Sequence, residues 1–153
     1  MKIEIYADNL KPTDVKYNQL IYSLSLIIVK DNLVFILYRD TDMIYHFPKI
    51  GYSREFDQPL AIKSITDQYG FDETLLVKSV SIYEHFPKRT YVNHYFKFIL
   101  ANDASLSLNQ EHEEKQLWLS CSDALMALEQ YEGDDRYGAQ KTEKEFIALF
   151  NSL

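Results

Sequence analysis

Cysteine, glycine and proline are scarce in this sequence, and no apolar run is long. Cys121 is the only cysteine, which excludes an intrachain disulfide and a zinc site built on four cysteines. Four glycines and four prolines leave little room for flexible linkers. The longest apolar stretches, such as residues 24–29, are far shorter than the roughly 20 residues of a membrane-spanning helix. Charges at Lys2, Glu4 and Asp8 interrupt any signal-peptide pattern, so we expect a soluble, cytoplasmic protein.

A basic surface is also lacking. The 153 residues carry a formal net charge of −7, and the sequence pI is near 5.0. Nucleic-acid backbones and anionic membranes need a basic surface, so this balance argues against both as partners. An anionic small molecule would need a bound cation or a few well-placed Lys and Arg side chains. The length fits one domain over residues 1–153, with one core.

Apolar and aromatic runs alternate with turn residues along most of the chain. The segment Lys30-Asp31-Asn32 separates two such runs, and Asp and Asn tolerate the geometry of a tight hairpin. A second long hairpin is predicted around Pro87-Lys88-Arg89-Thr90, and residues 11–18 are interpreted as a loop. The predicted strands span residues 2–6, 20–29, 33–38, 44–47, 75–86, 91–100 and 116–119.

Three helices are predicted between and after these strands. Asp57 stands at an N-cap position, Pro59 follows in the first turn, and Gly70 marks the end of the first helix. Ser120 or Ser122 caps a second helix that reaches about residue 131. The buried stripe of the first helix is predicted as Leu60, Ile62, Ile65 and Tyr69, and a last helix presents Phe146, Ile147, Leu149 and Phe150. A mixed sheet with such helices is an α/β or α+β sandwich.

The stretch from His46 to Phe71 reads HFPKIGYSREFDQPLAIKSITDQYGF and resembles the Nudix hydrolase family. The family's box reads Gly, five residues, Glu, seven residues, then Arg-Glu-apolar-any-Glu-Glu-any-Gly-apolar. With Glu55 placed on the first glutamate of the box, Ile65, Gly70 and Phe71 fall in register. The pair Phe47-Pro48 also matches the segment that usually precedes the glycines of the box, so the resembling box spans Lys49 to Phe71.

The order of elements around the box agrees with the same family. The paired strands before it end at Arg39, and the acids Glu113 and Glu114 precede a strand with Trp118 and a capped helix. The resemblance therefore covers roughly residues 20–131. It implies a Nudix-like α/β/α sandwich with a mixed sheet, one box helix and C-terminal helices. Related domains are often homodimers, and the apolar last helix is suited to such a contact or to the core.

In this family, clustered glutamates on one helix face hold Mg²⁺ or Mn²⁺, which neutralises a pyrophosphate and activates water. This sequence departs from that set. Lys63 replaces the arginine of the box, Ser64 replaces the next glutamate, and Asp67 and Gln68 replace the last two. Lys49 occupies the usual glycine position. The loss of a positioned acid or base typically costs on the order of 100- to 10,000-fold in rate, so efficient hydrolysis is not expected.

We therefore expect a protein that binds a nucleotide-like or pyrophosphate-containing small molecule with weak or no hydrolysis. Phosphate groups would be bound directly by the cationic side chains nearby, with metal binding weak or absent. The predicted ligand-binding residues are Lys49, Arg54, Lys63 and Arg39.

The alternative is an active, divergent hydrolase of a nucleoside-diphosphate-linked substrate that uses Mg²⁺ or Mn²⁺. Its catalytic candidates are Glu55, Asp67 and Glu114, and its metal ligands would be Asp67, Gln68 and Glu113. A third hypothesis is a structural or partner-binding domain.

Each candidate also has an ordinary structural explanation. Asp67 and Gln68 would serve equally as the solvated face of an amphipathic helix, and acids before a strand are usually surface charges. His85 and His94 lie on facing strands, where cross-strand packing is favoured over a metal site. Cys121 is expected to be a small buried residue, and Trp118 to belong to the core.

Overall fold

The computed structural model describes residues 2–7, 10–15, 19–41, 43–52, 57–69, 75–101 and 114–129. Within these residues, eight strands form one mixed sheet, with the order β1-β6-β7-β2-β3-β4 along its main path. The first elements are β1 (Lys2–Tyr6) and a 3-10 helix (Pro12–Val15), which lies inside the segment predicted as a loop. The sheet is mixed because β1 pairs in parallel with β6 (Leu76–His85), and β6 pairs antiparallel with β7 (Arg89–Ile99).

The long strand β2 (Gln19–Lys30) is the centre of the sheet. It pairs in parallel with β7, from Gln19 opposite Arg89 to Val29 opposite Ile99. On its other side it pairs with β5 (Lys49–Tyr52) near its start and with β3 (Leu33–Arg39) at its end. The two residues between β2 and β3, Asp31 and Asn32, have φ values of 52° and 60°, as a type I′ hairpin turn requires. The predicted first hairpin is therefore confirmed.

Strand β3 leaves β2 after this turn and forms the centre of a second part of the sheet. It pairs antiparallel with β4 (Ile44–His46) on one side and with β8 (Lys115–Leu119) on the other. The strand β5 was not predicted from the sequence. It exists because Lys49 and the three residues after it pair with the start of β2, and the carbonyl of Pro48 accepts a hydrogen bond of 2.9 Å from the Leu26 amide.

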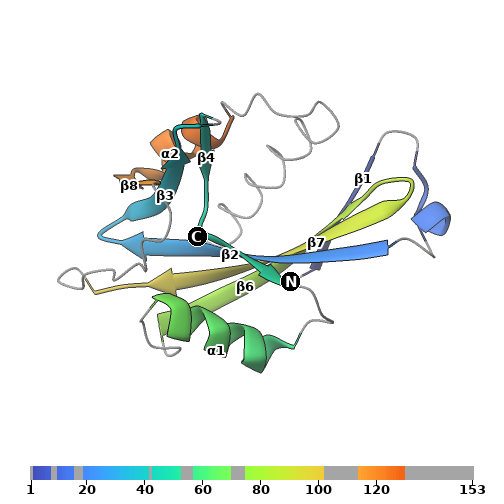
Figure 1. The fold of residues 1–153 in the computed structure, drawn as a ribbon, viewed down its shortest axis with the longest axis horizontal. Helices are drawn as coiled ribbons and strands as arrows, with labels where there is room; N and C mark the ends of the chain where they lie inside the picture. Colours follow the sequence, from blue (N-terminus) through green and yellow to red (C-terminus); the bar gives the residue numbers. More distant parts are fainter. Residues whose placement is uncertain are drawn as a thin grey trace.

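In the described part of the chain, the helix α1 lies on one side of the sheet and the helix α2 on the other (Figure 1). The helix α1 (Gln58–Tyr69) begins after Asp57, whose carboxylate accepts a 3.2 Å hydrogen bond from the Leu60 amide. The helix α2 (Cys121–Glu129) begins after Ser120, whose hydroxyl accepts a 3.2 Å hydrogen bond from the Asp123 amide. Both predicted caps are confirmed, with Ser120 rather than Ser122 bonding the amide of the first turn. Neither helix is long and apolar enough to cross a membrane.

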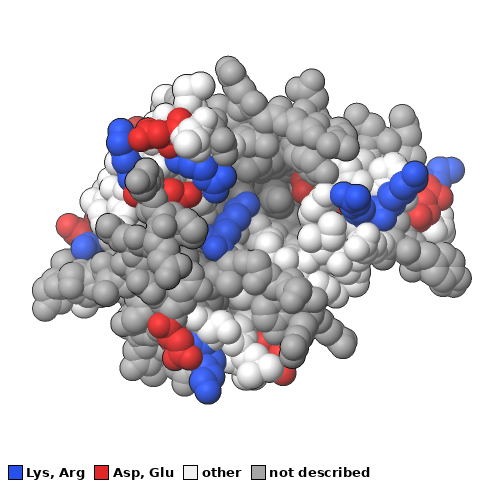
Figure 2. All heavy atoms as spheres, in the orientation of Figure 1, with Lys and Arg blue, Asp and Glu red and all other residues white. Residues whose placement is uncertain are grey.

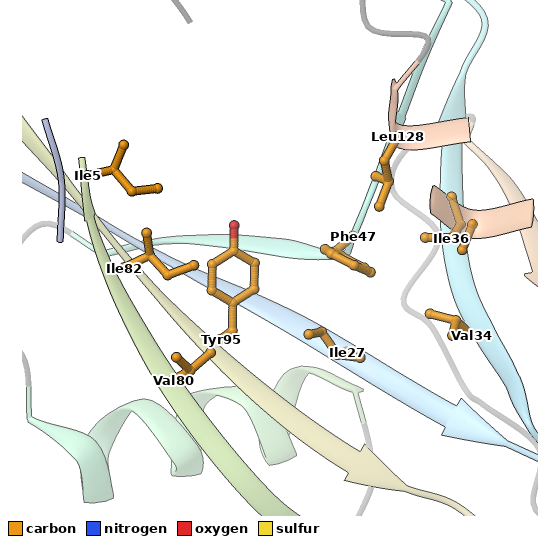
Figure 3. Close-up of a cluster of buried hydrophobic side chains, with 10 residues drawn as sticks. Ile5, Ile27, Val34, Ile36, Phe47, Val80, Ile82, Tyr95 and Leu128 are labelled. Atoms are coloured by element: carbon orange, nitrogen blue, oxygen red, sulfur yellow. The ribbon is translucent and has the colours of Figure 1, made fainter. Parts of the chain in front are cut away.

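Two core clusters occupy the two faces of the sheet. The cluster on the α2 side joins Phe47 and Tyr95, which meet edge to face at a centroid distance of 6.2 Å, to Leu128 of α2 (Figure 3). The cluster on the α1 side includes Ala61, and Trp118 packs against it with its ring edge-to-face against Phe35. The prediction that Trp118 belongs to the core is confirmed.

The stripe predicted for α1 is partly wrong. Leu60 is 58% exposed, whereas Ala61 is fully buried and Ile62 packs against the same cluster. The short side chain of Ala61 faces the sheet, and this turns Leu60, one residue and about 100° away, toward solvent. The side chains of Ile65 and Tyr69, and the predicted last helix with Phe146, lie outside the described residues. The homodimer contact expected of that helix stays a prediction.

Candidate functional site

The exposed side of α1 carries three of the box positions. Lys63, Ser64 and Asp67 are all exposed, on a helix whose opposite side is held against the sheet by Ala61. Lys63 and Asp67 are four residues apart, so they are neighbours on the helix surface. This surface therefore presents one cation, one hydroxyl and one carboxylate to solvent.

The start of the loop that leads to α1 is fixed by three successive residues. Phe47 is fully buried in the core, and Pro48 accepts the hydrogen bond from Leu26. Lys49 then pairs with Ser25 of β2, and its side chain is exposed. A predicted phosphate-binding cation thus stands at a defined place at the beginning of the box loop.

A cluster of three charged or ionisable side chains lies beside this point, and we call it the Glu114 cluster: Arg39, His46 and Glu114. The Oε1 atom of Glu114 accepts a hydrogen bond from Nε of Arg39 at 3.2 Å and lies 3.0 Å from Nε2 of His46. The side chains of His46 and Glu114 are 11% and 16% exposed, whereas Arg39 is 46% exposed. The structure therefore brings together two predicted site residues, Arg39 and Glu114, through a histidine that the sequence analysis did not select.

The environment of Glu114 keeps it ionised. Partial burial by itself would raise the pKa of this carboxyl, but the charge and hydrogen bond of His46, followed by those of Arg39, outweigh burial and lower the pKa below its ordinary value. Glu114 is thus a carboxylate whose Oε1 atom already serves two donors.

Charged side chains of both signs surround this cluster. Lys115 forms an exposed ion pair with Asp40 at 3.7 Å, and its ammonium also lies over the ring of Tyr38, 5.8 Å from the centroid. Figure 2 shows positive and negative side chains interspersed over the region of β3, β4 and β8.

The described side chains do not make a site that fits Mg²⁺ or Mn²⁺. These ions need several oxygen ligands, usually including one or two carboxylates aimed at the same point. On α1, Asp67 supplies one carboxylate and Ser64 stands where the resemblance places another, and Glu114 is paired with Arg39 and His46. Among the residues that the structure describes, no three His, Cys, Asp or Glu side chains are grouped to hold a metal.

Several predicted site residues lie outside the described part of the chain. These are Arg54, Glu55 and Glu113, together with the side chain of Gln68. Their predicted roles in ligand, metal or proton binding stay predictions.

The two histidines of the second hairpin have partners of their own. Nδ1 of His94 lies 2.6 Å from the Ser81 hydroxyl, and Nδ1 of His85 lies 3.0 Å from the Thr90 hydroxyl. Cross-strand packing was the favoured interpretation, and it is confirmed. Cys121 is half-buried at the start of α2, and burial raises the pKa of its thiol, against the lowering effect of Lys97.

His46 is the residue that sequence reasoning missed. One signal was available: it is the polar residue directly before the Phe47-Pro48 pair, in a short and otherwise apolar-aromatic strand. A buried polar side chain in such a place needs a partner. Its partner is 68 positions away, so the pairing itself was not visible in the local pattern.

No protein-family model matches the sequence, and no curated protein matches it. Solved structures do share the fold. An Ap4A hydrolase from C. elegans, in a binary complex, is similar at a TM-score of 0.54 and 15% identity, over 84% of this chain and 98% of that one. The MutT protein from Methanosarcina mazei gives a TM-score of 0.53 at 13% identity, over 85% and 97% of the two chains.

A longer protein contains the same fold as a part. The bifunctional NMN adenylyltransferase/ADP ribose pyrophosphatase from Francisella tularensis, complexed with AMP and a manganese ion, is similar at a TM-score of 0.57 and 7% identity. The match covers 90% of this chain and 43% of that protein.

Proposed function

Because this chain has the fold of the Nudix hydrolases, we propose that it binds a nucleotide-like or pyrophosphate-containing small molecule and hydrolyses it weakly or not at all. The similar structures include enzymes named for Ap4A and for ADP-ribose, both of which contain phosphate chains. The ligand class of this protein is inferred from that likeness together with the cations around the box loop.

The observation that carries the proposal is the pairing of Glu114. For efficient metal-dependent hydrolysis, an acid from the segment before β8 would have to replace the carboxylates lost at Ser64 and Gln68. Glu114 instead has its Oε1 atom within 3.2 Å of Arg39 and 3.0 Å of His46, so a metal would have to displace two donors to reach that oxygen. Removing partners from such a charge-assisted contact is costly.

The cations nearby are suited to bind phosphate directly. Lys49 and Lys63 are exposed, at the start of the box loop and on the box helix. Arg54 lies between them in the sequence, and Arg39 is partly exposed in the Glu114 cluster. In a protein with a net charge of −7, such a local set meets the need of an anionic ligand.

Charge reversal tests this binding site. The triple variant Lys49→Glu, Arg54→Glu, Lys63→Glu should weaken the binding of ADP, ADP-ribose or diadenosine tetraphosphate by at least about tenfold, because a hydrogen bond to a charged group contributes about 1.5–3 kcal/mol. Isothermal titration calorimetry of each compound measures the change.

A matched control carries the same change in charge elsewhere. Lys11, Lys88 and Arg89 are exposed and belong to neither α1 nor β5, so reversing these three should leave affinity within about twofold at 0.15 M salt. Equal affinity in the wild type and the site variant would contradict the proposed site.

A hydrolysis assay distinguishes the proposed binding protein from an active hydrolase. The same panel, extended to nucleoside triphosphates and sugar nucleotides, is incubated with Mg²⁺ and with Mn²⁺ and followed by chromatography. We expect binding without efficient cleavage. Metal-dependent turnover that disappears in a folded Asp67→Ala variant would favour the active alternative, with Asp67 as a metal ligand.

A further inference from the structure

Lys97 is a buried lysine on the α2 side of the sheet. It lies in β7 two residues after Tyr95, so the two side chains are on the same face of the sheet. Its neighbours on the adjacent strands are Ile27 of β2 and Lys78 of β6. Tyr95 and Ile27 belong to the core cluster on that face (Figure 3), and Lys97 itself is only 7% exposed. A lysine is therefore packed beside an apolar core.

Two ionisable groups lie close to Lys97. Lys78 is exposed and directly opposite it, two residues before Val80 of the same core cluster. Cys121, at the start of α2, packs against that cluster and is half-buried. Among the described residues, these are the groups whose charge acts on Lys97. The charged neighbour of Lys97 within this part of the chain is thus another cation, which disfavours the ammonium form.

Burial and the second cation together favour the uncharged amine at position 97. Burial lowers the pKa of the Lys97 ammonium below its ordinary value of 10.5, the charge of Lys78 lowers this pKa further, and Cys121 opposes them in part. A lysine that is desolvated or next to another cation is an activated nucleophile. The neighbouring thiol is the weaker competitor, because burial raises the pKa of Cys121 and the thiolate is the reactive form of a cysteine.

We propose that Lys97 is a nucleophilic amine that captures a small aldehyde with an anionic group, and that Lys78 attracts the anion. The nitrogen of Lys97 forms a bond to the carbonyl carbon, and the bond between this carbon and its oxygen then breaks. The two hydrogens of the amine leave with that oxygen as water, and an imine remains. The aldehyde must be small because Lys97 is little exposed, and a negative charge is favoured because Lys78 is exposed beside it. This site does not depend on the proposed function.

Reductive trapping tests the site in the wild-type protein. Glyoxylate, a small aldehyde with a carboxylate, is mixed with the protein and sodium cyanoborohydride at pH 7, and peptide mass spectrometry gives the rate of labelling at each lysine. Lys97 should be labelled at least about fivefold faster than the exposed Lys11 and Lys88, because more of it is the neutral amine. This advantage should shrink toward about pH 10, where ordinary lysines also lose their protons. Labelling of Lys97 no faster than that of Lys11 and Lys88 would overturn the proposal.

Acetaldehyde, which has the same number of carbons but no charge, tests the role of Lys78. The ratio of labelling at Lys97 to labelling at Lys88 should be at least about threefold higher with glyoxylate than with acetaldehyde. In Lys78→Gln this preference should disappear, and Lys97 should react more slowly with both aldehydes, because the like charge opposite it is gone. Lys11→Gln removes an exposed cation outside the sheet and should keep both the rates and the preference of the wild type.

The remaining outcomes also decide. An unchanged preference for glyoxylate in folded Lys78→Gln overturns the role of Lys78 and the anionic class of the aldehyde. Lys97→Arg keeps a positive charge but has no amine that forms an imine, so the fast labelling should be lost in this variant. Fast labelling that persists in Lys97→Arg assigns the reaction to another residue and overturns the proposal.

Discussion

At the scale of single residues, two histidines of this protein have opposite environments. His46 has a polar partner at each ring nitrogen, the carbonyl oxygen of Phe47 at 2.8 Å from Nδ1 and Oε1 of Glu114 at 3.0 Å from Nε2. His94 is 3% exposed. Its Nδ1 atom lies 2.6 Å from the Ser81 hydroxyl, and its ring stacks with that of Tyr22 at a centroid distance of 6.3 Å. Burial lowers the pKa of His94 to about 4 from an ordinary value of 6.5. The folded protein therefore keeps this ring neutral.

This shift predicts a pH dependence of stability. As the pH falls through 6.5, the unfolded chain takes up a proton at His94 that the folded chain resists. The stabilisation is fully present above about pH 6.5 and is lost as the pH falls toward 4. Melting temperatures of the wild type should thus decline more steeply between pH 7 and pH 4.5 than those of His94→Gln. Parallel profiles for the two proteins would show that His94 contributes nothing to the acid sensitivity.

The residues that could be predicted from the sequence were those with local partners. Asp57 and Ser120 bond to amides three positions later, so their capping roles followed from composition and spacing. The Glu114 cluster joins residues 68 and 75 positions apart. Arg39 and Glu114 were selected only through the family resemblance, and His46 has no place in that pattern. Long-range contacts between side chains decide such a cluster, and periodicity carries no information about them.

At the scale of elements, the cap of α1 is a separable contribution to the box helix. Asp57→Ala leaves the Leu60 amide without its side-chain acceptor and should lower the free energy of unfolding by about 1 kcal/mol. Urea denaturation measures the loss. Asp57→Asn keeps an acceptor and should cost only a few tenths of that amount. A loss of equal size in both variants would mean that the charge of Asp57, rather than the cap, is what stabilises the helix.

The positions of the strands along the sequence were easier to predict than which strands pair with one another in the sheet. β2 and β3 were visible because each is a long apolar run and a two-residue turn joins them. β5 was missed because four residues, one of them a glycine, are too few for a strand pattern to stand out. These residues are extended because they pair with β2. The burial of Ala61 in place of Leu60 has a similar cause, because the way α1 packs on the sheet decides which of its side chains are buried.

At the scale of the whole molecule, Phe47 connects the start of the box loop to the core cluster on the α2 side of the sheet. It is fully buried, meets Tyr95 edge to face, and belongs to the same cluster as Leu128 of α2 (Figure 3). Phe47→Ala should therefore lower the free energy of unfolding by about 3–5 kcal/mol, as large-to-small changes in a core do.

Two variants control this prediction. Phe47→Leu keeps most of the volume and should cost less than half as much. Met43, in contrast, is 71% exposed, so Met43→Ala should change stability by less than about 0.5 kcal/mol. Differential scanning calorimetry of the three variants gives the comparison. A small effect of Phe47→Ala would show that the loop start is not coupled to this core.

The pairing of β2 with β7 has a consequence for how the chain reaches its fold. The two strands run in parallel and join Gln19 to Arg89, Val29 to Ile99 and every pair between them, always 70 positions apart. No hairpin can bring such strands together, so the intervening chain must be closed into a long loop before the central ladder gains any hydrogen bond. Proteins that depend on such distant pairings fold slowly, on the order of milliseconds to seconds. During that interval the edge of β2 is unpaired, and unpaired strand edges make incompletely folded chains prone to associate with one another.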